Sequence, residues 1–178
     1  MAQDTAGRTE PMGYAIGYAR GKGTFRVYIL GVGALIFLTV AVSSGSQLAL
    51  ILGSAGLVAA FFFYPLIETG KARIGANQYG VFIEGFGLIA WRGIAGLRIA
   101  KRAIRNITVH ELEITLSRTM DGAVMADWRN LPYHRLLMRL PWRMPSDDKL
   151  LIDLEPFGLE PKTILNEIQR RWSYFGRG

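Results

Sequence analysis

The chain has 178 residues, a formal net charge of +7 and no cysteine. The absence of cysteine excludes disulfides, thiolate metal sites and cysteine nucleophiles. A membrane surface explains the basic balance more simply than nucleic acid does, so we expect no nucleic-acid partner.

Residues 1–24 form a basic, glycine-rich segment without a periodic apolar face. Such a segment has little surface to bury, so the sequence predicts a flexible cytoplasmic arm. The alternative is a segment that becomes ordered along a partner, with Tyr14 and Tyr18 as its anchors.

Residues 25–67 contain two apolar runs, at about 27–42 and 48–66, with an uncharged serine-rich turn between them. Each run is about long enough, as a helix rising ~1.5 Å per residue, to cross a hydrocarbon core of ~30 Å. Backbone amides in lipid must be satisfied within their own element, so the sequence predicts a transmembrane helical hairpin. Because basic residues flank the hairpin and avoid its turn, we expect an inner-membrane protein with both termini in the cytoplasm.

The second apolar run carries small residues at helical spacing. They are Ala49, Gly53, Gly56 and Ala60, and Gly31, Ala34 and Ala41 make a weaker stripe in the first run. Small residues let helix backbones approach closely in lipid. The stripes therefore predict that the two helices pack on each other, and the alternative is that one stripe receives a helix of a larger complex. Glu68, just beyond the second run, is expected in the headgroup layer.

Residues 68–178 form one predicted cytoplasmic domain. Short apolar runs separated by glycine turns predict a small antiparallel sheet or barrel. The expected strands cover 73–78, 80–84, 87–91, 94–101, 109–116 and 149–154. Pro161 then begins an amphipathic helix, whose apolar residues from Ile164 to Trp172 would close one end of the sheet.

Residues 117–148 form an insertion in which arginines alternate with aromatic and aliphatic side chains. The candidate contact residues are Trp128, Arg129, Arg135, Arg139, Trp142 and Arg143. Residues 133–140 have room for about two helical turns, which would place Arg135 and Arg139 on one face. The pattern is typical of a helix that binds anionic lipid headgroups, of a protein-docking surface, or of an insertion folded against its own domain. Composition does not separate these three readings.

A second basic group follows a predicted strand and comprises Arg98, Lys101, Arg102 and Arg105. It is expected to form a solvated turn, with anionic headgroup contact as the competing interpretation. His110 and His134 have no second ligand at metal spacing, and Glu111 and Glu113 are expected to be solvated on one strand face. Because no nucleophile or nucleotide motif accompanies them, we expect no cofactor, no metal and no enzymatic activity.

Residues 80–85, followed by Ile89, Trp91 and Ile94, and the closing helix resemble the bacterial pleckstrin-homology-like (PH-like) membrane proteins. The resemblance covers about residues 27–116 and 148–174; the insertion is longer and more basic than the family's usual connection. It implies a membrane α+β fold: a two-helix hairpin, then a small antiparallel PH-like β-barrel or sheet closed by a C-terminal amphipathic helix. Trp91 would pack against the barrel, and no catalytic residue is implied.

These features together predict a non-catalytic integral membrane protein. We expect an accessory, assembly or scaffolding subunit that packs its hairpin against a larger inner-membrane complex. The alternative is a membrane-surface module that binds anionic lipid headgroups through its PH-like domain and basic insertion.

Overall fold

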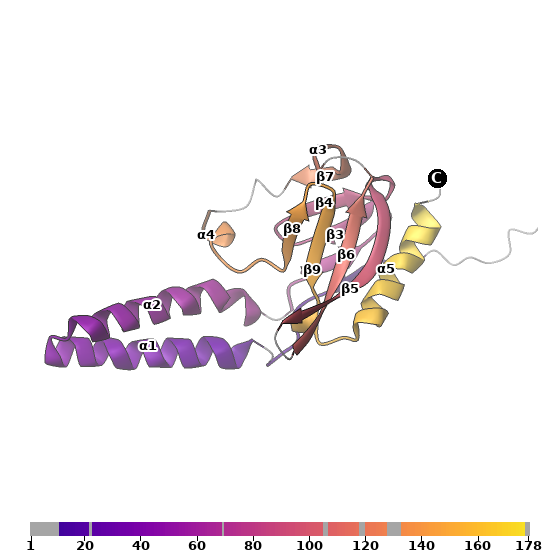
Figure 1. Ribbon diagram of the computed structural model, residues 1–178. Helices are drawn as coiled ribbons and strands as arrows, with labels where there is room; N and C mark the ends of the chain where they lie inside the picture. The colour runs from indigo at the N-terminus through magenta and orange to yellow at the C-terminus, as the bar shows by residue number, and fades with distance from the viewer. Residues whose placement is uncertain are drawn as a thin grey trace, which may run out of the picture.

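The computed structural model describes residues 11–21, 23–68, 70–104, 107–117, 120–127 and 133–176. Its two main parts are a long helical hairpin and an α+β domain built on two antiparallel sheets, and they lie end to end (Figure 1). The two helices run side by side away from the domain, and the turn that joins them is at the end remote from the sheets.

The hairpin consists of α1 (Thr24–Ser44) and α2 (Gln47–Phe63), and a 3-10 turn at Tyr64–Leu66 extends the second helix. Both helices are long and apolar enough to cross a membrane. Within the most apolar stretch of each, only 17% of the residues are buried inside the protein. A core helix of a water-soluble domain would instead be mostly buried.

The turn between the helices is short because its two residues serve as caps. Gly45 ends α1 in the left-handed conformation, with φ of 67°, which a glycine adopts without steric cost. The Ser46 hydroxyl then accepts a hydrogen bond of 3.3 Å from the backbone N–H of Ala49 and caps the start of α2.

Small residues lie in the contact between α1 and α2. A Cβ atom at Gly53 would be 2.7 Å from Cγ of Leu38, and one at Gly56 would be 2.9 Å from Cβ of Ala34. On the same helix Ala49 is buried and Ala60 is half-buried. Glycine at these positions therefore lets the two backbones approach closely.

Gly31 does not take part in this packing, contrary to expectation. A Cβ atom there would meet no other atom within 4 Å. The buried face of α1 runs instead through Val27, Ala34 and Ala41, which recur every seven residues. Of the weaker stripe predicted on the first helix, Ala34 and Ala41 are therefore buried, and only Gly31 lies outside the contact.

The strands form two antiparallel sheets. The first has the order β1-β2-β3-β4-β7 and consists of β1 (Tyr14–Ile16), β2 (Ile74–Ala76), β3 (Gly80–Ile83), β4 (Gly87–Ala90) and β7 (Val124–Asp127). The second has the order β5-β6-β9-β8 and consists of β5 (Ile94–Ile104), β6 (Ile107–Leu116), β9 (Lys149–Asp153) and β8 (Trp142–Ser146). All six strands expected from the sequence are present.

Within the described residues the sheets do not join into a closed barrel, so of the predicted sheet or barrel the structure has two separate sheets. A 3-10 turn at Trp91–Gly93 separates β4 from β5 and connects the first sheet to the second. β4 pairs with β7 instead of β5. Trp91 is buried, and its Nε1 donates a hydrogen bond of 2.9 Å to the carbonyl of Asn77.

The N-terminal segment supplies a strand that the sequence did not predict. Within residues 11–21, β1 pairs with β2, and the ring of Tyr18 lies 5.2 Å from that of Phe157. The backbone N–H of Ala19 donates a hydrogen bond of 2.9 Å to the carbonyl of Pro156. This part of the expected flexible arm is thus integral to the domain, whereas residues 1–10 lie outside the described residues.

The hydrophobic core lies between the two sheets and α5 (Pro161–Phe175). α5 runs along the domain and contacts β2, β5 and β6, so it bridges both sheets (Figure 1). Ile164 and Ile168 on its inner face are fully buried. The helix therefore buries the apolar face that the sequence predicted.

Replacement of Gly56 by leucine should weaken the hairpin, because the new side chain would overlap Ala34. Overpacking of this kind typically costs about 1–3 kcal/mol of unfolding free energy. Unfolding in mild-detergent micelles, titrated with a denaturing detergent, measures the change. Gly31→Leu is the matched control, because it adds the same side chain where there is open space. Equal stabilities of the two variants would contradict the assigned interface.

Candidate functional site

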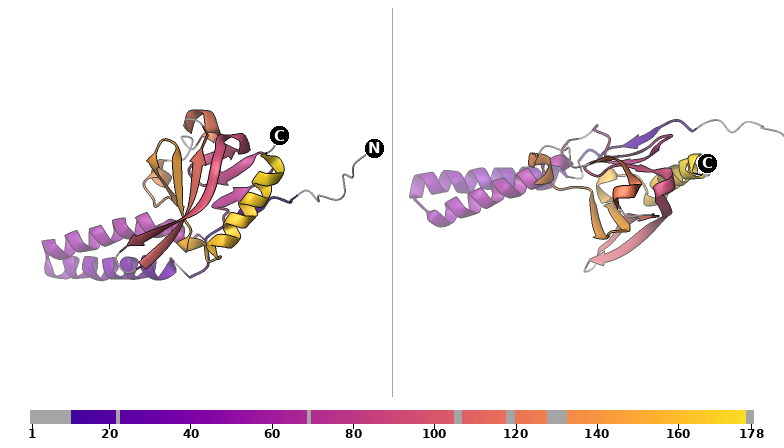
Figure 2. Two further views of the ribbon diagram at one scale, coloured as in Figure 1. Left: turned by 45° about the vertical axis from the view of Figure 1, so that its right-hand side comes forward. Right: turned by 90° about the horizontal axis from the view of Figure 1, so that it is seen from above.

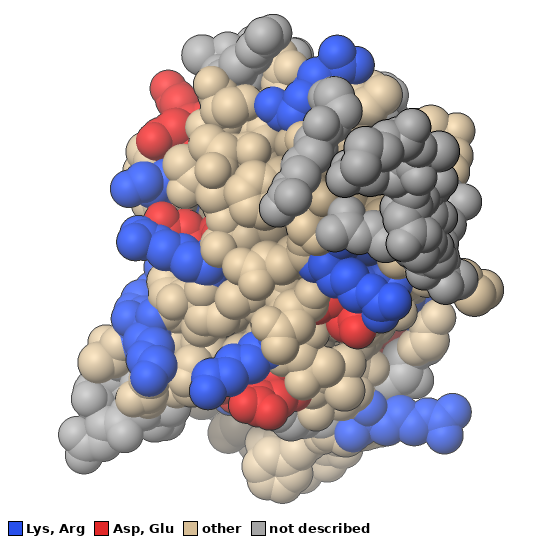
Figure 3. Space-filling model, turned by 90° about the vertical axis from the view of Figure 1, so that its right-hand side faces the viewer, with Lys and Arg blue, Asp and Glu red and all other residues tan. Residues whose placement is uncertain are grey.

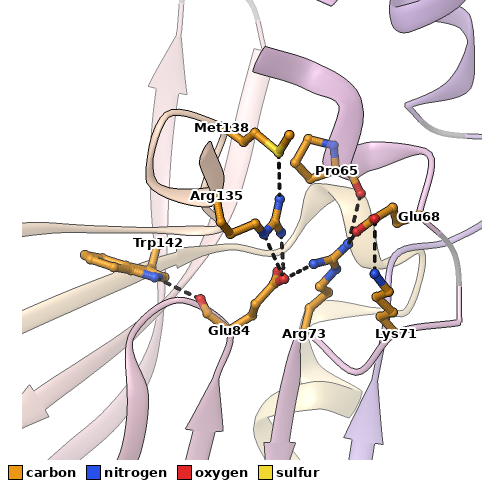
Figure 4. A network of polar contacts seen from close by, with 8 residues as sticks. All are labelled: Pro65, Glu68, Lys71, Arg73, Glu84, Arg135, Met138 and Trp142. Carbon is orange, nitrogen blue, oxygen red and sulfur yellow. Dashed lines mark hydrogen bonds and ion pairs between the residues drawn. The ribbon is translucent and has the colours of Figure 1, made fainter. Parts of the chain in front are cut away.

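The hairpin meets the sheets in a network of charged side chains centred on Arg73 (Figure 4). Arg73 directly precedes β2 and is completely buried. Its guanidinium group donates to Glu84, to Oε2 of Glu68 at 2.8 Å and to the carbonyl oxygen of Pro65 at 3.3 Å. Pro65 belongs to the turn that extends α2, so this one side chain connects the end of the hairpin with the first sheet.

Glu84, at the end of β3, receives a second arginine. Arg135 lies on the single helical turn α4 (Tyr133–Leu136), and its Nη2 and Nε lie 2.6 Å and 3.2 Å from Oε1 of Glu84. Trp142 of β8 donates a hydrogen bond of 3.0 Å from Nε1 to the carbonyl oxygen of Glu84. Glu84 therefore connects the first sheet with the insertion and with the second sheet.

Glu68 lies in this junction, where it accepts hydrogen bonds from Arg73 and, at 3.1 Å, from Lys71. Although burial raises the pKa of Glu68, the hydrogen bonds from Arg73 and Lys71 outweigh that effect and hold the pKa below its usual value. Glu68 is therefore ionised at neutral pH and serves as a partner of the buried arginine.

Tyr18 closes the network from the side of the N-terminal segment. The Arg73 guanidinium carbon lies 5.1 Å from the centre of the Tyr18 ring, which is a cation–π contact. Burial raises the pKa of the Tyr18 phenol to about 12, despite the opposing charge of Arg73. The segment 11–21 thus contributes both main-chain pairing and an aromatic cover to the junction.

The insertion does not form the expected two-turn helix with a shared arginine face. The helix described within residues 133–140 is one turn long, and Arg135 and Arg139 bind different carboxylates of the same domain. Arg139 pairs with Asp153 at 2.7 Å, and its backbone N–H donates a hydrogen bond of 2.9 Å to the carbonyl of Phe62 in α2. For these residues the geometry favours an insertion folded against its own domain.

Two of the remaining candidate contact residues, Trp142 and Arg143, have partners as well. Arg143 pairs with Glu111 at 2.9 Å, and the ring of Trp142 meets that of Phe86 edge-on, with 5.1 Å between centres. Trp128 and Arg129 lie outside the described residues.

The two glutamates of β6 are buried instead of solvated. Glu113 pairs with Arg98 at 2.7 Å, and Glu111 pairs with Arg102 at 3.3 Å as well as with Arg143. Arginine thus neutralises both carboxylates. Among the described residues, no group of three or more histidine, aspartate and glutamate side chains is placed to hold a metal ion.

Sequence reasoning missed the Arg73–Glu84 pair. Arg73 directly precedes β2 and Glu84 directly follows β3, and only the pairing of these two strands brings the side chains together. The available signal was a charged residue directly before an apolar strand, because a charge at such a position needs a partner if it is buried. Comparisons with protein-family models, with curated proteins and with solved structures gave no match.

Replacement of Arg73 by glutamine should destabilise the protein by about 3–5 kcal/mol, because Glu68 and Glu84 lose a buried partner. Chemical unfolding measures the change. Arg98→Gln is the control: it removes one arm of an ion pair whose arginine side chain is 69% exposed, and should cost less stability. The assignment of Arg73 as the junction residue is wrong if the two variants lose similar stability.

The raised pKa of Tyr18 predicts a specific sensitivity to alkali. Below the ordinary phenol pKa of 10.0 the group is neutral in both the folded and the unfolded chain. As the pH rises toward 12 the unfolded chain loses this proton first, so the folded state becomes less stable. The unfolding free energy should therefore fall more steeply between these two pH values in the wild type than in Tyr18→Phe. Parallel pH profiles would contradict a buried phenol.

Proposed function

We propose that the protein is an integral inner-membrane protein whose hairpin spans the bilayer and carries a PH-like domain on the cytoplasmic side. Its role is non-catalytic: it is an accessory, assembly or scaffolding subunit of a larger membrane complex. The observation that carries this proposal is the pair of exposed apolar faces on the hairpin.

These outward faces remain after the helices have packed on each other. On α1 the exposed side chains at helical spacing are Phe25, Ile29, Val32, Ile36 and Val40, and on α2 they are Leu48, Ile51, Val58 and Phe62. An apolar surface of this extent is unfavourable in water and is satisfied by lipid or by another transmembrane helix. The small-residue face of α2 is already occupied by α1, so a partner helix would contact these larger side chains.

The charges at the two ends of the hairpin support the proposed orientation. Arg20, Arg26 and Lys71 are exposed near the ends of the helices that join the domain. The opposite end, from Ser43 to Gln47, carries no charge. Basic residues are retained on the cytoplasmic side of a membrane, which supports a cytoplasmic domain and an external turn.

The junction supports a scaffolding role over a headgroup-binding role for the arginines. Arg135, Arg139 and Arg143 are engaged with carboxylates of their own domain. Exchange of these partners for lipid phosphates would break ion pairs that are partly buried. The same contacts hold the domain in one orientation at the end of the hairpin, as a scaffold requires. The arrangement of two antiparallel sheets and a covering helix supports the PH-like assignment.

A photo-crosslinking amino acid at Val58 or Ile36 tests the partner directly, because both side chains point outward from the hairpin. We expect a discrete protein adduct at one of these positions after irradiation of intact membranes. The same group at Tyr79, which is exposed on the β2–β3 turn, is the control and should not give that adduct. Lipid adducts alone at both hairpin positions would contradict the role as a subunit, although the membrane anchor would stand.

A further inference from the structure

Two exposed apolar side chains lie beside the hairpin on the insertion. Tyr133 is 88% exposed and Leu137 is 70% exposed, although the neighbouring Arg135 and Arg139 are tied to the domain. In the view of Figure 1, α4 lies on the hairpin side of the sheets, above the last turns of α2. The hydrogen bond from Arg139 to Phe62 fixes this position. Measured along the hairpin axis, the insertion thus presents apolar groups level with the end of α2.

A basic ribbon projects from the same end of the domain. β5 and β6 pair along their whole length, but β9 pairs with β6 only from Glu111 to Thr115, so the rest of the ribbon extends beyond the sheet. Figures 1 and 2 show this extension near the base of the hairpin, where it points sideways from the hairpin axis. Lys101, Arg102 and Ala103 on the extension are exposed.

The end of the domain away from the hairpin carries both basic and acidic side chains. Figure 3 views the molecule from the side away from the hairpin, and its Lys and Arg side chains lie interspersed with Asp and Glu. The exposed apolar groups of the insertion and Lys101, by contrast, lie at the base of the hairpin. Lys101 has no ion-pair partner within the part of the chain that the structure describes.

We propose that Tyr133, Leu137 and the β5–β6 extension form a second contact with an anionic lipid surface, in addition to the hairpin. This inference rests on the proposed function, because the hairpin axis then defines the membrane normal. Side chains level with the last turns of α2 lie in the headgroup region. Tyr133 and Leu137 enter the boundary between headgroups and acyl chains, and Lys101 faces lipid phosphates.

The two contacts lie on different sides of the hairpin base, as the views of Figure 2 show. A hairpin alone would let the domain tilt against the membrane plane. Contacts displaced from the hairpin axis resist that tilt, and they hold the opposite end of the domain away from the lipid. The lipid contact therefore uses the apolar side chains of the insertion together with Lys101. The paired arginines Arg135 and Arg139 hold the insertion against the domain.

Single-cysteine labelling of the full chain tests this contact, because the native sequence has no cysteine. An environment-sensitive NBD fluorophore is placed at Tyr133→Cys, Leu137→Cys or Ala103→Cys, and the protein is reconstituted into vesicles of phosphatidylcholine and phosphatidylglycerol. A lipid with a nitroxide at a shallow acyl position serves as the quencher. Ile51→Cys on α2 reports hairpin insertion, and Tyr79→Cys is the matched control remote from the junction.

We expect blue-shifted, quenched emission at positions 133 and 137, and unquenched emission at position 79. Emission at position 103 should be quenched only with phosphatidylglycerol present. That quenching should be lost at high salt and after Lys101→Glu, because the contact is electrostatic. Quenching at 51 without quenching at 133 and 137 would overturn the second contact alone. Absence of quenching at position 51 as well would overturn the proposed membrane anchor.

Discussion

The ion pair between buried Arg73 and half-buried Glu84 is the interaction on which the arrangement of this protein depends. Burial of a guanidinium group is costly unless charged and polar partners surround it, and here those partners are Pro65 in the hairpin extension, Glu68 just after it and Glu84 just after β3. A pair of apolar side chains of similar volume could give the same stability. We infer that the network serves to specify how the domain sits on the hairpin.

The hairpin and the domain, which this network holds together, have surfaces of different chemistry. The hairpin exposes apolar side chains over most of its length, whereas Arg98, Arg135, Arg139 and Arg143 of the domain pair with its own carboxylates. These surfaces fit the proposed role, in which the hairpin binds a partner and the domain lies beside it. The proposed lipid contact at the hairpin base would add resistance to tilting without using the paired arginines.

The sequence predicted the elements well and their connections poorly. The two apolar helices, six strands and the closing helix follow from local periodicity, which a single sequence displays directly. β1 was missed because edge pairing in a three-residue strand uses main-chain groups and leaves no apolar period. The arginines of the insertion were expected to point outward, since their carboxylate partners Glu84 and Asp153 come from distant strands. Gly31 was misassigned because it was grouped with Ala34 and Ala41, whereas the third residue of the buried α1 face is Val27.

The most direct test is to measure whether the turn of the hairpin and the domain lie on opposite sides of a membrane. Ser44→Cys at the turn and Tyr79→Cys in the domain are both exposed positions in a chain without native cysteine. A membrane-impermeant maleimide added to intact spheroplasts should label position 44 at once and position 79 only after the membrane is permeabilised. Labelling of both positions before permeabilisation, or of neither, would contradict a hairpin that crosses the bilayer with its domain in the cytoplasm.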